Sequence, residues 1–202
     1  RGVHVQLGRL SHTVDDGGLI GWVHPAPPAM LKGHDAILAV DIGGTNIRCG
    51  IVKTRHRKAP DFSLAKVVRR VKWRHADDGP NRGSIVEHIA EMLEDMVLYS
   101  ERKKIRLAPF IGIGCPGLIR QDGSISRGAQ NLPGDWESHA FHLPSEVWRR
   151  MPMIGSGPTL VLMHNDAVVQ GLSELPFMRE VKHWGVLTIG TGLGNASFTN
   201  LA

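Results

Sequence analysis

The chain has 202 residues, 42% of them hydrophobic and 21% charged, which is the ordinary range for a globular protein. Its 24 basic and 19 acidic residues give a formal net charge of +5, which favours an anionic ligand. The basic residues are scattered and lack aromatic interleaving, so we expect no nucleic-acid partner. No run approaches the roughly 18 apolar residues of a membrane span and no signal peptide is visible, so we expect a cytoplasmic protein without a membrane partner.

Residues 1–35 carry the weakest structural signals. Residues 3–7 predict at most a short strand, Asp15–Gly18 predicts a turn, and the prolines of Pro25–Pro28 disfavour regular structure. We therefore expect this segment to be an extension or linker that leads into the folded core. Because the chain starts with Arg1 and stops shortly after a glycine-rich loop, we also expect it to be part of a longer protein.

The segment Asp41-Ile-Gly-Gly-Thr-Asn46 joins two predicted strands. An unbroken apolar run, residues 36–40, precedes it, and a run rich in β-branched residues, 47–53, follows it. Two glycines allow a tight hairpin turn whose free amides, with the Thr and Asn side chains, suit phosphate oxygens, while the Asp suits a cation. An ordinary Gly-Gly hairpin explains the segment equally well. A second glycine loop, residues 190–194, also follows an apolar run and favours the phosphate interpretation.

The rest of the chain predicts further strands and helices. Ser84 and Glu87 have the spacing of a capping box, at the start of an amphipathic helix that reaches Val97. Cys49 and Cys115 fall inside apolar runs, so we expect free buried thiols. This order of elements predicts an α/β domain, a mixed sheet with helices packed against it. The other predicted strands are 63–74, 110–115, 159–163 and 184–190, and the other helices are 143–150 and 167–175.

Few side chains in the sequence are candidates for chemistry. Asp166 follows a predicted strand, at the edge where α/β folds place catalytic groups, and a carboxylate there can accept a proton from an attacking hydroxyl. On position alone, capping of the following helix is the simpler role for Asp166. Asn131, in a Pro- and Gly-rich loop, can bind a polyol or stabilise a turn, and we expect Glu174 to be solvent-exposed. We find no Ser-His-Asp arrangement, Cys/His metal cluster or P-loop sequence.

Four segments, in order, resemble motifs of the ROK (repressor, open reading frame, kinase) family of sugar kinases, which belongs to the actin-like ATPase superfamily with its ribonuclease H-like fold. Residues 41–46 resemble the first phosphate loop and residues 187–194 the second. Residues 112–117, followed by 131–136, resemble the sugar-side segment. The segment Asn165-Asp-Ala167, followed in the sequence by Gly171 and Glu174, resembles the family's catalytic segment.

The resemblance implies ATP and Mg²⁺ as cofactors, a sugar as substrate, and a homodimer, since the family often dimerises. It implies that Asn131, Asn165 and Asp166 bind the sugar, with Asp166 as the base that deprotonates a sugar hydroxyl. It further implies that Asp41 positions Mg²⁺ through water. The residues implied to face the ATP phosphates are Gly43, Gly44, Thr45, Asn46, Gly190, Thr191, Gly192 and Gly194.

Three features depart from the family pattern. Asn195 and Ala196 follow the second loop where the family usually has more glycine, and Asp135 is inserted before Trp136. The chain also stops before the family's second lobe. The implied division is an extension, 1–35, an ATPase-like and sugar-binding lobe, 36–183, and the start of a truncated C-terminal lobe, 184–202.

The leading hypothesis is an ATP-dependent hexose kinase of glucokinase type, or its N-terminal part, that transfers the γ-phosphate to a sugar hydroxyl, with O6 as the expected acceptor. One rival is a kinase for an N-acetylated amino sugar, or one that uses another phosphate donor. The other rival is a non-catalytic sugar-sensing regulator or degenerate sugar-binding protein.

Overall fold

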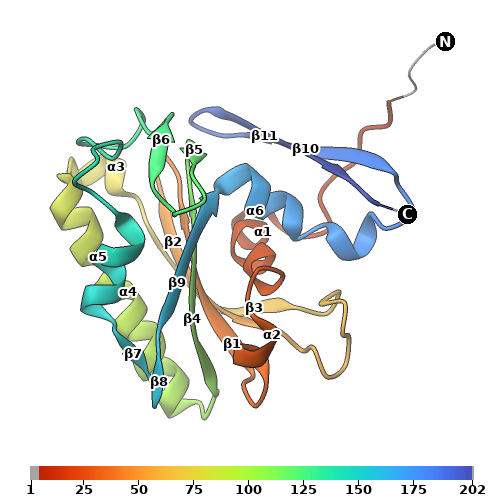
Figure 1. The fold of residues 1–202 in the computed structure, drawn as a ribbon, viewed down its shortest axis with the longest axis horizontal. Helices are drawn as coiled ribbons and strands as arrows, with labels where there is room; N and C mark the ends of the chain where they lie inside the picture. Colours follow the sequence, from red (N-terminus) through yellow and green to blue (C-terminus); the bar gives the residue numbers. More distant parts are fainter. Residues whose placement is uncertain (1–4, 202) are drawn as a thin grey trace.

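The structure, a computed structural model, describes residues 5–201 and is built on a five-stranded mixed sheet (Figure 1). The strand order is β3-β2-β1-β4-β9. β1 (Ala36–Ile42), β2 (Ile47–Lys53) and β3 (Lys66–Trp73) form an antiparallel meander, and β4 (Leu107–Cys115) and β9 (Leu160–Asn165) continue the sheet parallel to β1. The unbroken apolar runs of β1 and β4 occupy the centre, where both faces of a strand are buried.

One face of the sheet is covered by α4 (Arg82–Arg102) and α5 (Leu143–Arg150) (Figure 1). Ile85, Ile89 and Leu93 of α4 belong to the same buried cluster as alternate residues of β1, among them Leu38. The capping box predicted at Ser84 is wrong. The helix begins earlier because Asn81 is its N-cap, with Oδ1 accepting a hydrogen bond from the Ser84 amide at 2.9 Å.

The opposite face is covered by α1 (Val14–Ile20), the 3-10 helix η1 (Gly21–Val23), α2 (Pro28–Leu31) and α6 (Asp166–Leu172) (Figure 1). The turn predicted at 15–18 is therefore wrong, because these residues lie within α1. The expectation of a linker also fails for 14–31. Trp22 of η1 is 1% exposed, and a Cβ added to Gly112 of β4 would lie 2.1 Å from the Trp22 ring, so the segment packs directly on the sheet.

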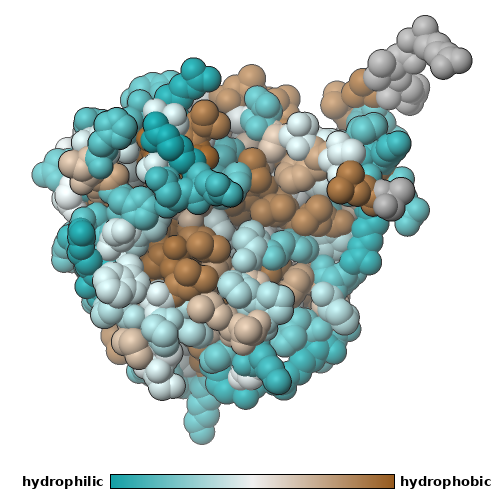
Figure 2. Space-filling model, viewed as in Figure 1, coloured by the Kyte–Doolittle hydropathy of each residue, from teal (hydrophilic) through white to brown (hydrophobic). Residues whose placement is uncertain are grey.

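The remaining elements are short, apart from one hairpin. β10 (His183–Ile189) and β11 (Leu193–Thr199) form a separate two-stranded sheet, packed on α6 through Val186 and Phe198, which stacks on Trp184 with ring centroids 4.3 Å apart. Its outer side exposes apolar side chains, visible as brown surface in Figure 2, namely Leu187, Ile189 and Leu193. The others are α3 (His75–Asp78), β5 (Leu118–Ile119), β6 (Ile125–Arg127), β7 (Met153–Ile154), β8 (Gly157–Pro158) and η2 (Leu175–Phe177).

Three smaller expectations have clear outcomes. The predicted strand at 3–7 lies partly outside the described residues, and 5–7 adopt neither helix nor strand. Cys49 and Cys115 are free and buried, as predicted. Within residues 5–201, no helix combines the length and hydropathy needed to cross a bilayer. The mixed sheet with helices on both faces is the predicted fold class.

Candidate functional site

The turn between β1 and β2 is held by one hydrogen bond within the turn and by two hydrogen bonds from α3. It is closed by the Gly43 amide, which donates to the Asn46 carbonyl at 2.9 Å. The buried ring of His75, in α3, donates from Nε2 to the Gly43 carbonyl at 2.8 Å, and the Ala76 amide donates to the Thr45 carbonyl at 3.3 Å. These three hydrogen bonds end on carbonyl oxygens of the turn and hold its shape from within the protein.

The second glycine turn, at the tip of the β10–β11 hairpin, meets the first. The hydroxyl oxygens of Thr45 and Thr191 lie 2.6 Å apart. Gly44 lies between Thr191 and Asn131, because a Cβ added there would be 3.2 Å from a side-chain carbon of each. Three segments that are far apart in the sequence thus converge at one point, and all three were predicted to contribute to one site.

Asp166 is the first residue of α6, directly after β9. Asn165 is the N-cap, since its Oδ1 accepts from the Val168 amide at 3.1 Å, while its Nδ2 donates to the Gly117 carbonyl at 2.9 Å. The alternative that Asp166 merely caps the helix is therefore wrong, because the preceding residue does so. Burial raises the pKa of Asp166 above that of a solvated aspartate.

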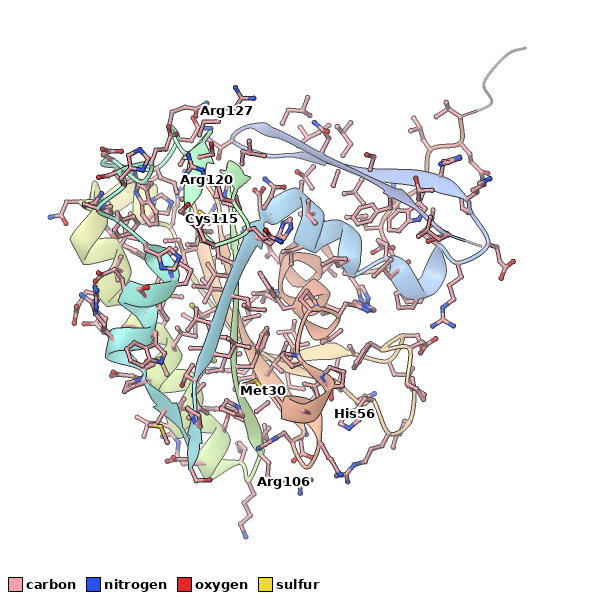
Figure 3. The ribbon with its side chains drawn as sticks, in the orientation of Figure 1. Met30, His56, Arg106, Cys115, Arg120 and Arg127 are labelled. Carbon is pink, nitrogen blue, oxygen red and sulfur yellow. The ribbon has the colours of Figure 1, made fainter. Side chains whose placement is uncertain are left out.

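Asp41 and Asp166 lie beside each other at the carboxyl edge of the sheet. A Cβ added to Gly114, which pairs with Asp41 in the sheet, would lie 3.7 Å from both Asp41 Oδ1 and Asp166 Cα. Burial raises the pKa of Asp41 to about 6; Arg48, which donates to Oδ2 at 3.1 Å, opposes this, and the charge of Asp166 adds to it. No residue in 5–201 forms a hydrogen bond with Oδ1 of Asp41. Figure 3 labels Cys115 at this edge, close to the start of α6.

The chain is similar in sequence and in fold to known proteins. No family model matches the chain. It is 31% identical over 166 residues to the glucokinase of Thermotoga maritima, in an alignment that covers 81% of this chain and 44% of the relative. A ROK family glucokinase from Streptomyces griseus, in complex with glucose and AMPPNP, shares the fold at a TM-score of 0.59 and 23% identity, with 82% of this chain and 45% of that chain covered.

This chain is a relative of the ROK-family sugar kinases. A third similar protein, the inorganic polyphosphate/ATP-glucomannokinase of an Arthrobacter species, matches at 27% identity and a TM-score of 0.59, over 82% of this chain and 58% of that chain. The predicted ribonuclease H-like fold class is thereby confirmed. The chain spans about half the length of these relatives.

The ROK resemblance implies a cation, and different cations require different sets of ligands. Residues 5–201 contain no group of three or more His, Cys, Asp or Glu side chains placed to hold a metal ion. Asp41, with its unpaired Oδ1, and the adjacent Asp166 supply two carboxylates. Mg²⁺ keeps several waters and is usually held by one or two carboxylates together with substrate phosphates, so this pair suits Mg²⁺ bound with a nucleotide and does not suit a structural zinc.

The sugar-side segment lies next to this point. Trp136 is buried and donates from Nε1 to the Pro133 carbonyl at 2.9 Å, so the loop keeps a packed shape despite the inserted Asp135. A shallow hollow opens beside the loop, next to the Arg127 labelled in Figure 3. Its lining consists of Gly117, Leu118, Arg127, Gly128, Gln130 and Glu137.

Three side chains of the site had not been predicted, and one was predicted in the wrong environment. The first is His75, which binds the Gly43 carbonyl of the turn. The second is Arg48, which binds Asp41. The third is Asp15, which binds Arg48 and so reaches Asp41 through it. Only Arg48 had a signal in the sequence, because the tight hairpin places it opposite Asp41 in the β1–β2 ladder. Glu174 is 5% exposed, contrary to expectation, because its carboxylate accepts from the Ser11 amide at 2.9 Å.

Proposed function

We propose that the protein containing this chain is an ATP-dependent sugar kinase with a hexose of the glucose type as its acceptor. The observation that carries the proposal is the meeting of two glycine turns at the edge of the sheet where Asp41 and Asp166 both lie next to Gly114. Phosphoryl transfer needs charge neutralisation, precise positioning and one group that receives a proton, and this arrangement offers each of them. The similarity to a glucokinase supports the same assignment.

The two turns are proposed to hold the ATP phosphates. The Gly43 and Gly190 amides close their own turns, so the donors left for a phosphate chain are the other turn amides and the Thr45 and Thr191 hydroxyls, which lie where the turns meet. Mg²⁺, when bound, would neutralise phosphate charge on the side of Asp41. Asn46 and Gly190 would complete this part of the site, with Gly43, Gly44, Gly192 and Gly194.

Asp166 is proposed to accept the proton of the attacking sugar hydroxyl. Burial raises the pKa of Asp166, which makes it a stronger base than a solvated aspartate. Asn131 and Asn165 are proposed to orient the sugar through their side-chain amides; Asn165 keeps one amide hydrogen for this after its bond to Gly117. The acceptor oxygen is proposed to be O6.

The test uses the full-length protein. Wild type and Asp166→Asn would be assayed for ATP- and Mg²⁺-dependent phosphorylation of glucose, mannose and N-acetylated amino sugars, and sugar binding would be measured by calorimetry. We expect turnover by wild type, and sugar binding without turnover by the variant. If wild type binds a sugar but transfers no phosphate from ATP or polyphosphate, the kinase proposal fails and a sugar-sensing regulator takes its place.

Two attributes of the whole protein stay predictions. The homodimer implied by the resemblance is checked by analytical ultracentrifugation of the full-length protein. The cytoplasmic location is checked by fractionation of cells.

A further inference from the structure

Helix α1 reaches the site through two charged side chains. Asp15 Oδ1 accepts a hydrogen bond from Nε of Arg48 at 2.8 Å, and Nη2 of Arg48 lies 2.8 Å from the same oxygen in a salt bridge. The next residue, Asp16, pairs instead with Arg70 of β3, which also lies 3.6 Å from Asp15. Arg48 and Arg70 project from the neighbouring strands β2 and β3, so salt bridges to both strands hold the start of α1 against the sheet.

Arg48 connects these salt bridges to Asp41. Its third nitrogen, Nη1, donates to Asp41 Oδ2 at 3.1 Å, so one guanidinium holds two carboxylates, one on α1 and one on β1. The Arg48 and Asp41 side chains are only 15% and 16% exposed. Charged groups at such depth interact more strongly than surface pairs, and the fixed planar shape of the guanidinium allows it to orient both partners at once.

The backbone of α1 completes the enclosure of Asp41. A Cβ added to Gly18 would lie 3.0 Å from the Asp41 carboxyl carbon and 3.1 Å from Oδ1. With Oδ2 bound to Arg48 and the helix against one side, the carboxylate has little freedom to rotate. Its unpaired Oδ1 therefore lies between Gly18 and Gly114, since a Cβ added to these glycines would be 3.1 and 3.7 Å from it.

We propose that Arg48, anchored by Asp15, is a positioning residue that fixes the Asp41 carboxylate for the cation carried by the nucleotide. The N-terminal segment is then a working part of the site as well as a cover for the sheet. This inference rests on the proposed kinase function. Arg48 itself has no contact with substrate in this scheme and acts only through Asp41.

The experiment compares full-length wild type with Asp15→Asn, Arg48→Lys and the matched control Asp16→Asn, which removes a salt bridge from the same helix without touching Arg48. Binding of Mn²⁺ with a non-hydrolysable ATP analogue would be measured by electron paramagnetic resonance, alongside Tm, kcat and the KM for ATP. We expect the two test variants to weaken Mn²⁺ binding and raise the KM by about tenfold, the effect of losing a hydrogen bond to a charged group. Asp16→Asn should leave both within about twofold, with a similar loss of Tm.

The outcomes separate the two proposals. If Asp15→Asn and Asp16→Asn weaken Mn²⁺ binding equally, or if neither weakens it, Arg48 has no positioning role. The salt bridges between α1 and the sheet then serve the fold alone. If wild type binds no Mn²⁺–nucleotide, the kinase proposal and this inference both fall. Should Arg48→Lys not fold, the milder Asp15→Asn still decides the question.

Discussion

The hydroxyl groups of Thr45 and Thr191 touch at 2.6 Å although 146 residues separate them in the chain. Each sits in a glycine turn, one between two strands of the central sheet and the other at the tip of an outlying hairpin. The hairpin packs on α6 through Val186 and Phe198, and in that position its tip meets the first turn.

Thr191→Val tests this contact. Loss of the hydroxyl removes one hydrogen bond at an exposed position, so we expect Tm to change little, with less than about 0.5 kcal/mol lost in unfolding free energy. We expect the KM for ATP to rise by roughly three- to tenfold in the full-length protein, since one donor is worth about 1 kcal/mol. Thr199→Val, at the far end of β11, is the control. Equal KM values for the two variants would contradict a phosphate role for the turn.

Asp166→Asn should abolish proton acceptance without removing the fold. Because a general base contributes roughly 10²- to 10⁴-fold, we expect kcat to fall by that factor while the dissociation constants for sugar and ATP change little. Asp95→Asn, on the exposed side of α4, is the control and should behave as wild type. Retention of kcat within a few-fold in Asp166→Asn would rule out the role.

Asp41 should make the ligand-free protein less stable as pH rises. Its pKa is raised from 3.8 to about 6 in the folded state, so the fold binds the proton more tightly than the unfolded chain does. The stabilisation from the proton is complete below the unfolded pKa and is lost as pH rises through the folded pKa; a shift of about two units corresponds to about 3 kcal/mol.

Asp41→Asn removes this pH dependence. We expect the variant and wild type to have similar unfolding free energies near pH 4, and the variant to be more stable by about 3 kcal/mol at pH 8. Denaturant unfolding at a series of pH values measures the difference. A gap that stays constant with pH would show that ionised Asp41 is not destabilising. The variant should also lose cation binding, an example of stability gained at the expense of function.

His75→Ala should loosen the first glycine turn. The change leaves the Gly43 carbonyl without its partner and opens a cavity, so we expect a loss of at least about 1–3 kcal/mol and a higher KM for ATP. His88→Ala is the control, because its half-exposed ring packs against Trp73, as His75 does, with ring centroids 4.1 and 5.8 Å apart, and forms no hydrogen bond with the turn. A KM equal to that of wild type would show that the turn keeps its shape without His75.

Gly112→Ala tests how tightly the N-terminal segment packs. The added methyl group would overlap the ring of Trp22, which is buried and has no room to move, so we expect a loss of about 1–3 kcal/mol or more. Gly8→Ala has no atom within 4 Å of the added carbon and serves as the control. Thermal unfolding gives both values, and equal Tm values would contradict the close packing.

Much of the sheet could be predicted because its central strands are apolar without interruption. α1 could not, because Asp15-Asp-Gly-Gly18 has the composition of a turn. Its glycines serve tertiary packing, as Gly18 does against Asp41, and such a contact leaves no local signal.

In the candidate site, too, features with a local sequence signal could be predicted and tertiary contacts could not. Both glycine turns and Asp166 stood out because their residue types are unusual at the ends of apolar runs. The pairing of Arg48 with Asp15 depends on how a helix docks onto a distant strand, which periodicity does not encode. The choice between Asn165 and Asp166 as the helix cap turned on a single residue, which is finer than sequence patterns resolve.

Trp22 beneath Gly112 has a practical consequence for anyone who prepares this protein. A clone trimmed to begin at Ala36, where the first predicted strand begins, would strip an entire apolar layer from one side of the sheet and bare Ile37, Ala39 and Phe110 to water. Such a product should precipitate or recruit chaperones, and its failure would say nothing about catalysis.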